Sequence, residues 1–319
     1  MLSDLLQHRV IFLLGKGGVG STCVAAALAL AASKHGSGVL AMESDVRGPM
    51  ASAFGVKPAF EPVMSSDRLF VMVLEGRHSL EEYLRLVVPA RTVLRAVFAS
   101  RLYQFFVQAA PGLKELMALG KVYYEAERKM GGASRWDAII VDLPASGQAL
   151  SLLRMPTAAQ ETFGDSVVGR EAGNINRMLR DRRQTTVVLV TTPEQLPISE
   201  TLETAAALTE MGITPAAIIF NRGRAPQFVS RDIARLKEYL IASGNAAGAE
   251  HLGQIARMEL DRASQAEHAL EQLRNHTHAP VIQLPQLDGF SGGELVRRLA
   301  QELAHAPTEK SSRRASLGG

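Results

Sequence analysis

The sequence predicts an α/β protein in which a doubly wound, mostly parallel sheet carries a helical insertion subdomain. Short, continuously apolar runs alternate with longer stretches of helical periodicity, as they do when helices cover both faces of a parallel sheet. A glycine-rich turn joins the first apolar run to the first helical stretch, and one long later interval is largely helical. No internal repeat is visible along the chain.

The apolar runs define the expected strands, because each is short and bounded by turn residues or charges. They are Val10–Leu14, Gly38–Met42, Ala138–Asp142, Thr186–Val190, Ala216–Phe220 and Pro280–Leu284. Helical spacing lies between these runs, at Ser21–Lys34, Ser199–Met211 and Gly292–Ala304. This alternation favours a parallel sheet with a helix after most strands.

The interval Ser79–Met130 departs from this alternation because it is long, apolar and largely helical. Pro89 and Pro111 divide it into several helices. A second, more polar helical piece covers Thr157–Arg183. We expect one domain over residues 1–306, with a helical subdomain formed by about 78–132 and 157–183, and a disordered Ser/Arg/Gly-rich tail at 307–319.

Composition excludes several classes of protein. The chain has 319 residues, of which 46% are hydrophobic and 21% charged, and its formal net charge is +3. A disordered chain is poorer in aliphatic residues, and a strongly nucleic-acid-binding domain carries a larger basic excess. The single cysteine, Cys23, excludes a disulfide scaffold. No apolar run reaches the roughly 18 residues of a membrane span, so we expect a cytoplasmic globular protein that binds no nucleic acid.

The glycine-rich turn reads Gly15-Lys16-Gly17-Gly18-Val19-Gly20-Ser21-Thr22 and stands between a strand and a helix. In that context glycines let backbone N–H groups surround a phosphate, and the helix N-terminus adds the positive end of its dipole. The general pattern is G-x-x-x-x-G-K-[ST], in which the hydroxyl binds Mg²⁺. Gly15, Gly20 and Thr22 keep this pattern, whereas Ser21 stands in place of the phosphate-binding lysine.

A plain glycine turn without a ligand is the alternative interpretation, and four glycines within six positions disfavour it. The missing lysine removes charge-assisted hydrogen bonds of about 1.5–3 kcal/mol each. It also removes a charge that stabilises the transferring phosphoryl group. The residues therefore predict a phosphate site with weakened binding and impaired hydrolysis.

The segment Lys16–Thr22 resembles the deviant Walker A motif K-G-G-x-G-K-[ST] of arsenite-pump ATPases, tail-anchored-protein-targeting ATPases and MinD/ParA-type switches. Further segments resemble the first two of these, the ArsA-like branch of P-loop NTPases. Glu43-Ser44-Asp45 is similar to its switch I, Asp142–Gln148 to its switch II, and Pro111–Lys121 to a helical motif of its bacterial members. The matches follow the family order from residue 10 to about 300.

The resemblance implies a role for each matching residue. Lys16 matches the signature lysine that reaches the nucleotide of the partner subunit in a dimer, and Asp45 matches the residue that orients the attacking water. Thr22 and Asp142 match Mg²⁺-linked positions, and Asn221 matches the adenine-reading asparagine. The implied nucleotide-binding set is Gly15, Gly17, Gly18, Val19, Gly20, Ser21, Thr22 and Asn221, with Asp142, Gly147 and Gln148 in switch II.

The residues themselves support part of this assignment. Carboxylates just past the carboxyl ends of parallel strands lie at the edge where α/β proteins bind ligands, which is where Asp45 and Asp142 are expected. The alternative for these two is a cap or turn role. For Asn221, a simple polar strand end is an alternative of nearly equal weight.

The departures from the family pattern fall at the positions that contact or act on the nucleotide phosphates in the family. Ser21 replaces the lysine, Gln148 the switch II histidine, and Val46-Arg47-Gly48 the Pro-Ala-His of switch I. We therefore expect a dimeric switch that binds ATP or ADP with Mg²⁺, hydrolyses it poorly, and couples nucleotide state to a protein or membrane-protein client. The alternative is a non-hydrolysing pseudo-ATPase, a scaffold or regulatory subunit in a heterodimer with an intact paralogue. A membrane-surface positioning switch is a third reading.

Other residues bear on metals and partners. The absence of a CxxC motif predicts that the chain lacks the zinc bridge of some family members, and the absence of the cysteine cluster that binds arsenite in the pump ATPases argues against metalloid transport. His276 and His278 form an isolated pair that is more often incidental than a metal site. A client groove in the helical subdomain is one interpretation of an apolar set, and internal packing is the favoured alternative: Val97, Phe98, Leu102, Phe105 and Phe106. The tail lacks an apolar face and so predicts no membrane anchor.

Overall fold

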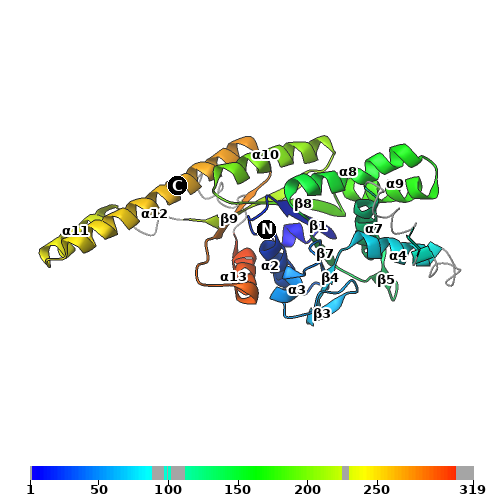
Figure 1. Cartoon of the computed structure of the whole chain (residues 1–319), viewed down its shortest axis with the longest axis horizontal. Coiled ribbons are helices and arrows are strands. Elements are labelled where there is room, and N and C mark those ends of the chain that lie inside the picture. Colours follow the sequence, from blue (N-terminus) through cyan, green and yellow to red (C-terminus); the bar gives the residue numbers. More distant parts are fainter. Residues whose placement is uncertain (1, 88–96, 99, 102–111, 225–229, 307–319) are drawn as a thin grey trace, which may run out of the picture.

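The computed structural model of the chain describes residues 2–87, 97–98, 100–101, 112–224 and 230–306. Its central feature is an eight-stranded sheet (Figure 1). Pairing is parallel between all neighbours except the last two strands, which are antiparallel. In spatial order the strands are β10 (Val281–Pro285), β9 (Pro215–Gly223), β8 (Thr185–Thr191), β1 (Val10–Gly15), β7 (Ala138–Asp142), β2 (Val39–Glu43), β4 (Leu69–Val73) and β3 (Val63–Ser66). The predicted α/β class is confirmed.

Side chains of β1 alternate between two hydrophobic cores, one on each face of the sheet. Val10, Phe12 and Leu14 pack into the first core, and Ile11 and Leu13 pack into the second. The helices over the first face are α7 (Leu113–Glu127), α8 (Ser146–Phe163), α9 (Val167–Arg180), α10 (Gln195–Glu210) and α12 (Ala246–His276). Those over the second are α1 (Leu2–Leu5), α2 (Ser21–Lys34), α3 (Pro49–Ala53) and α13 (Gly292–His305). Burial on both faces explains why the central strands read as continuous apolar runs.

The sequence does not predict the edge strands β3 and β4. Along β3 the residues alternate between half-buried and exposed, as expected at the edge of a sheet. The two strands form a hairpin, and Arg68 in its turn has a φ of 61°, in the left-handed region that non-glycine residues seldom adopt. The hairpin therefore lacks the glycine turn by which a sequence often signals such an element, and only β4, Leu69–Val73, has a continuous apolar run.

Four helices gather beyond the β3–β7 half of the sheet (Figure 1). Helix α4 (Gly76–Val87) packs on α7, which in turn packs on α8 and α9. A small hairpin, β5 (Lys129–Met130) and β6 (Ala133–Ser134), follows α7. The helical piece expected at Thr157–Arg183 divides between α8, which already begins at Ser146, and α9. Pro89, Pro111 and the tail 307–319 lie outside the described residues.

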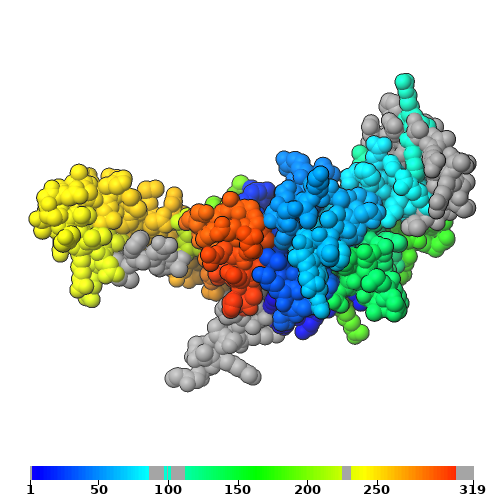
Figure 2. All heavy atoms as spheres, turned by 90° about the horizontal axis from the view of Figure 1, so that it is seen from below, coloured from blue at the N-terminus to red at the C-terminus, as the bar shows by residue number. Residues whose placement is uncertain are grey.

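A helical arm extends from the opposite end of the molecule (Figures 1 and 2). It consists of α11 (Ser230–Ala242) and the tip-side half of the long helix α12, and these two helices pack on each other. The other half of α12 packs on α10 and β10. The buried side of α12 consists mostly of small residues at intervals of three and four: Ala249, Gly253, Ala256, Ala263, Ala266 and Ala269. Within the described ranges, no helix combines the length and the apolar character that crossing a membrane requires.

Candidate functional site

The turn after β1 has the geometry of a phosphate-binding loop. Gly18 and Gly20 have φ values of 93° and 85°, which favour glycine. A Cβ atom on Gly15 would clash with the backbone oxygen of Val190 on β8, so this position also requires glycine. Val19 is 2% exposed and anchors the loop in the core, and nothing lies within 4 Å of a Cβ placed on Gly17. The loop is thus fixed on its inner side and open on its outer side.

Ser21 begins helix α2 directly after Gly20, and its side chain is half-buried. Helix α2 therefore directs the free N–H groups of its first turn toward the space above the loop. Strand β1 ends at the same edge of the sheet as β2, β7, β8 and β9, because all five run in parallel. The predicted loop, switch and asparagine residues are consequently brought to one edge.

Asn221 near the end of β9 is buried and packs behind the loop. Its Nδ2 donates a hydrogen bond to the backbone oxygen of Val19 over 2.9 Å. The same amide nitrogen lies 2.9 Å from where a Cβ atom of Gly20 would stand. Asn221 therefore ties β9 to the loop and explains why Gly20 carries no side chain. Adenine recognition by Asn221 stays a prediction.

Thr22 and Asp142 lie together beneath the loop. The Thr22 hydroxyl donates a hydrogen bond of 2.7 Å to Oδ2 of Asp142, at the end of β7. Asp142 is 3% exposed, and its other oxygen, Oδ1, has no hydrogen-bond partner within the described part of the chain. Burial, as the largest cause, and the charges of Glu43 and Asp45 together raise the pKa of Asp142 to about 7, although the Thr22 hydrogen bond lowers it.

This pair suits a magnesium ion. A hydroxyl and a carboxylate are the hard oxygen ligands that Mg²⁺ prefers. A buried, unpartnered carboxylate oxygen is costly unless a cation or a donor completes it. The residues present therefore fit the metal that their sequence pattern predicts. Among the described residues, which include His276, no group of three or more His, Cys, Asp or Glu side chains could hold a metal ion.

Glu43 fixes the switch I segment to the sheet. It is completely buried at the end of β2, and its two carboxylate oxygens accept the backbone N–H groups of Met50 over 2.7 Å and Ala51 over 2.9 Å. These donors belong to the first turn of α3, whose N–H groups have no partner within the helix. Burial raises the pKa of Glu43, and the two hydrogen bonds oppose the rise. Glu43 thereby holds the polypeptide that carries Asp45.

Arg47 occupies both carboxylate oxygens of Asp45. The guanidinium Nη2 lies 2.6 Å from Oδ2, and Nε lies 3.0 Å from Oδ1. The backbone N–H of Arg47 also donates to Oδ1 over 2.9 Å. These hydrogen bonds from Arg47 lower the pKa of Asp45. The residue predicted to orient an attacking water is thus paired with an arginine that itself departs from the family pattern.

Lys16 is held within its own chain. Its Nζ donates to Oε1 of Glu200 on α10 over 2.6 Å. The other oxygen of Glu200 accepts a long hydrogen bond of 3.4 Å from Ser146, the first residue of α8. Glu200 thus connects the loop to the start of switch II, where Gly147 and Gln148 are exposed. The roles of Glu43, Glu200 and Ser146 are not predicted by the sequence. Those of Glu200 and Ser146 depend on contacts between distant segments, and that of Glu43 depends on how the nearby helix α3 folds back onto β2.

Comparison with known proteins decides the family. The model of the family described as Anion-transporting ATPase matches residues 8–172 and 169–238 of the chain. The chain belongs to the anion-transporting ATPase family. ATPase BagA of Mycobacterium tuberculosis is 28% identical over 243 residues, which are 74% of this chain and 71% of the relative. ATPase GET3 of Malassezia globosa is 24% identical over 254 residues, which are 69% of this chain and 74% of the relative.

Membership of the anion-transporting ATPase family confirms the predicted resemblance and implies nucleotide binding, generally with Mg²⁺. The edge that carries the glycine loop, Thr22 and Asp142 is where such a nucleotide would bind. The predicted client surface is described only in part. Phe98 packs near Leu80 in a small satellite core, and Val97 is 38% exposed. Leu102, Phe105 and Phe106 lie outside the described residues.

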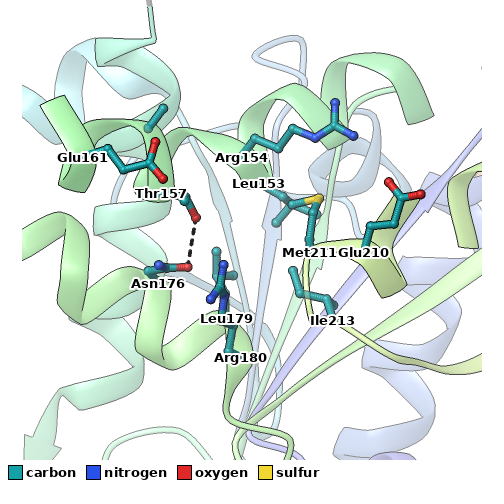
Figure 3. Close-up of a pocket in the computed structure, with 11 residues that line it drawn as sticks. Leu153, Arg154, Thr157, Glu161, Asn176, Leu179, Arg180, Glu210, Met211 and Ile213 are labelled. Carbon is teal, nitrogen blue, oxygen red and sulfur yellow. Dashed lines mark hydrogen bonds between the residues drawn. The ribbon is translucent and has the colours of Figure 1, made fainter. Parts of the chain in front are cut away.

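A separate hollow of about 350 Å³ lies between α8, α9 and the end of α10 (Figure 3). Its residues precede the amino ends of β8 and β9, so it opens at the edge of the sheet opposite to the loop. Leu153, Leu179 and Met211 give it an apolar floor. Two arginines and two glutamates line its margin, Arg154 and Arg180 with Glu161 and Glu210. This balance of charges selects neither anions nor cations.

Proposed function

We propose that the protein is a dimeric nucleotide switch of the ArsA-like type, which binds ATP or ADP with Mg²⁺ and hydrolyses ATP poorly. The observation that carries the proposal is the buried Asp142 beneath an open glycine loop: its Oδ2 accepts the Thr22 hydroxyl, and its Oδ1 has no hydrogen-bond partner among the described residues. The loop and the first turn of α2 supply N–H groups for the phosphates. Thr22 and Asp142 would hold the metal ion, which when bound neutralises phosphate charge.

Three features of the site support impaired hydrolysis. Ser21 gives the loop no cation for the β- and γ-phosphates. Both oxygens of Asp45 are engaged by Arg47, so its carboxylate is not free to position a water molecule. Gln148 stands exposed where the family has a histidine. Each feature changes a group that the family places around the reacting phosphate. Together the three features favour a subunit that hydrolyses ATP slowly.

Binding is tested by titrating the full chain with a fluorescent ATP analogue in the presence and absence of Mg²⁺. Asp142→Asn is expected to abolish the effect of Mg²⁺ and to weaken binding at least about tenfold, because one charge-assisted contact is lost. Asp261→Asn, an exposed change on the distant arm, is the matched control. Equal binding by both variants and the wild type would place the nucleotide elsewhere.

A non-hydrolysing scaffold or regulatory subunit is the second candidate, and the Asp45–Arg47 pair favours it. Ser21→Lys discriminates between the two functions. A large gain of ATPase rate from this single change indicates a site that is otherwise competent. No gain, together with retained ATP binding, indicates the scaffold role.

In the proposed dimer, Lys16 would have a role that does not depend on turnover by its own subunit. To reach a partner's nucleotide, Lys16 must leave Glu200, and this exchange would connect dimerisation to the start of α8. The partner would be a second copy or a paralogue with an intact loop, and a client protein would bind at the helices α4, α7, α8 and α9. Mixing the chain with such a paralogue tests this role. If the mixed complex hydrolyses ATP equally well with Lys16→Ala, Lys16 does not act across the dimer.

A further inference from the structure

A cavity of about 220 Å³ lies between α4, α7 and α9, and none of the loop or switch residues lines it. Its volume is below the roughly 300–1,000 Å³ of sites for metabolites and drug-sized molecules. A nucleotide or an apolar helix is therefore too large to be enclosed there, whereas a single side chain or a small organic group fits. The cavity also contains Gly120 and Lys121, part of the helical motif that the nucleotide site leaves unexplained.

Tyrosine rings form much of the cavity wall. Tyr83 comes from α4, and Tyr123 and Tyr124 come from α7. The faces of aromatic rings attract cations that lie within about 6 Å of the ring centroid. Tyr124 already illustrates this, because Nζ of Lys121 is 5.3 Å and Cζ of Arg128 is 5.8 Å from its centroid. The rings of Tyr83 and Tyr123 have no such cation within the described residues.

The lining of the cavity carries more negative than positive charge. Lys121 is 3% exposed and is its only cation among the described residues, and this ammonium is already paired with Glu82 over 2.7 Å and Glu125 over 3.3 Å. Glu127 accepts one hydrogen bond, from Gln184 over 3.2 Å. Glu171 on α9 is half-buried and makes no hydrogen bond or ion pair within the described ranges.

The Glu171 carboxylate affects the pKa of two tyrosines that line the cavity. Burial raises the pKa of Tyr83, and the Glu171 carboxylate raises it further. Burial also raises the pKa of Tyr123, with added contributions from Glu127 and Glu171 and an opposing one from Arg177. The cavity therefore combines aromatic faces with a carboxylate that has no counter-ion in the part of the chain that the structure describes, which is the environment of a site for an organic cation.

We propose that this cavity binds a guanidinium group, either as the arginine side chain of a partner protein or as a small guanidinium compound. A guanidinium is planar, so it stacks on the tyrosine rings and donates in parallel to both oxygens of Glu171. An ammonium is a compact, strongly hydrated charge and uses the flat walls less well. Phosphates and carboxylates are repelled by the glutamates. The hollow in Figure 3 differs because its arginines and glutamates balance.

The test is calorimetric titration of the full chain with Nα-acetyl-arginine amide, with its neutral citrulline counterpart, and with a helical peptide that carries one arginine. Saturable binding of an arginine ligand, with no binding of citrulline, is expected. Glu171→Gln should weaken this binding about tenfold or more. Glu161→Gln, which removes an exposed carboxylate from the other hollow, should leave it unchanged.

The two sources of guanidinium give different results. Binding of the peptide alone identifies an arginine side chain of a protein, and binding of the blocked amino acid as well shows that the free group is sufficient. The inference is overturned if neither ligand binds, if citrulline binds equally, or if Glu161→Gln weakens binding as much as Glu171→Gln. Binding of ATP does not enter this test, so its result is independent of the proposed function.

Discussion

Asp142 combines burial, a single hydrogen bond and a free oxygen, and these features oppose its ionisation in the absence of a cation. Its pKa is raised from 3.8 to about 7, with burial as the largest cause. A cation bound at Oδ1 would reverse this shift, because an adjacent positive charge favours the ionised carboxyl group. The burial of the Asp142 carboxyl group therefore affects both the folding stability of the protein and its affinity for a cation.

The stability of the unliganded protein should consequently fall as pH rises from about 4 through 7. Between these values the folded state keeps a proton on Asp142 that the unfolded state has lost, so rising pH favours unfolding. Asp142→Asn keeps an acceptor for Thr22 and should flatten this dependence, and Glu43, whose pKa is also raised, should account for part of the remaining slope. Urea unfolding at pH 5 and pH 8 measures the effect. If the free energy of unfolding changes equally with pH in Asp142→Asn and in the wild type, the raised pKa of Asp142 is refuted.

Arg47 sets a second expectation at this scale. In the Ser21→Lys chain, Arg47→Ala should raise the ATPase rate further, because it frees the Asp45 carboxylate that Arg47 now engages. Folding stability should change little, since the Arg47 side chain is 87% exposed. Arg77→Ala, at another exposed arginine that pairs with a carboxylate, serves as the control. A fall in rate specific to Arg47→Ala would mean that Arg47 holds Asp45 in its productive position.

Among the secondary-structure elements, burial decides what the sequence reveals. The strands predicted from apolar runs are mostly buried on both faces, with the edge strand β10 as the exception, and their observed bounds differ from the expected ones by only a few residues. The arm was not predicted, because the buried side of α12 is made of alanine and glycine. Such residues give a helix a weak periodic signal, although their small size lets a second helix approach closely.

The same distinction applies to the candidate site. The sequence predicts the loop, Thr22 and Asp142 as parts of the site because local spacing places them at strand ends. The contacts of Glu43 with α3 and of Glu200 with Lys16 depend on tertiary packing and on which of several acidic residues lies nearest. The pairing of Asp45 with Arg47, only two residues apart, is a question of side-chain conformation that a residue pattern does not resolve.

Helix α7 depends on a buried ion pair. The Lys121 and Glu125 side chains are 2% and 0% exposed, and Glu82 of α4 completes the group. Lys121→Ala should destabilise the protein by about 3 kcal/mol, because it removes one of the two cations paired with the buried Glu125 carboxylate. Trp136 and Arg128 still donate to Glu125 and limit the loss. Chemical denaturation measures the change, with Lys114→Ala on the exposed side of α7 as control; equal effects would show that the ammonium is dispensable.

The arm should respond to mutation separately from the sheet. Ala256 is 3% exposed on the buried side of α12. Ala256→Glu forces a larger, charged side chain between packed helices, and overpacking alone costs about 1–3 kcal/mol. Hydrogen exchange should become faster in α11 and the adjoining half of α12, while β1 and β7 stay protected. Gln254→Glu is the control, because it adds the same charge at a nearby exposed position and should leave exchange in the arm unchanged. Loss of protection throughout the sheet would show that the arm folds together with the body.

At the scale of the whole molecule, the nucleotide edge lies between two helical assemblies. The helices α4, α7, α8 and α9 gather at one end and the arm projects from the other (Figure 1). The link from Lys16 through Glu200 to Ser146 leads from the loop toward the first assembly, because Ser146 begins α8. Strand β9 and Asn221 lead from the loop toward the arm, since α11 and α12 lie between β9 and β10 in the chain. A change at the loop therefore has a structural route to both ends.

The central claim is that the loop binds nucleotide although Ser21 provides no cation. Equilibrium titration of the wild type and Ser21→Lys with ATP and Mg²⁺ tests it most directly. Saturable binding is expected for both, with affinity higher by about 10- to 100-fold in Ser21→Lys, as one charge-assisted hydrogen bond of roughly 1.5–3 kcal/mol implies. Absence of saturable binding in both proteins, or equal affinity in the two, would contradict the account.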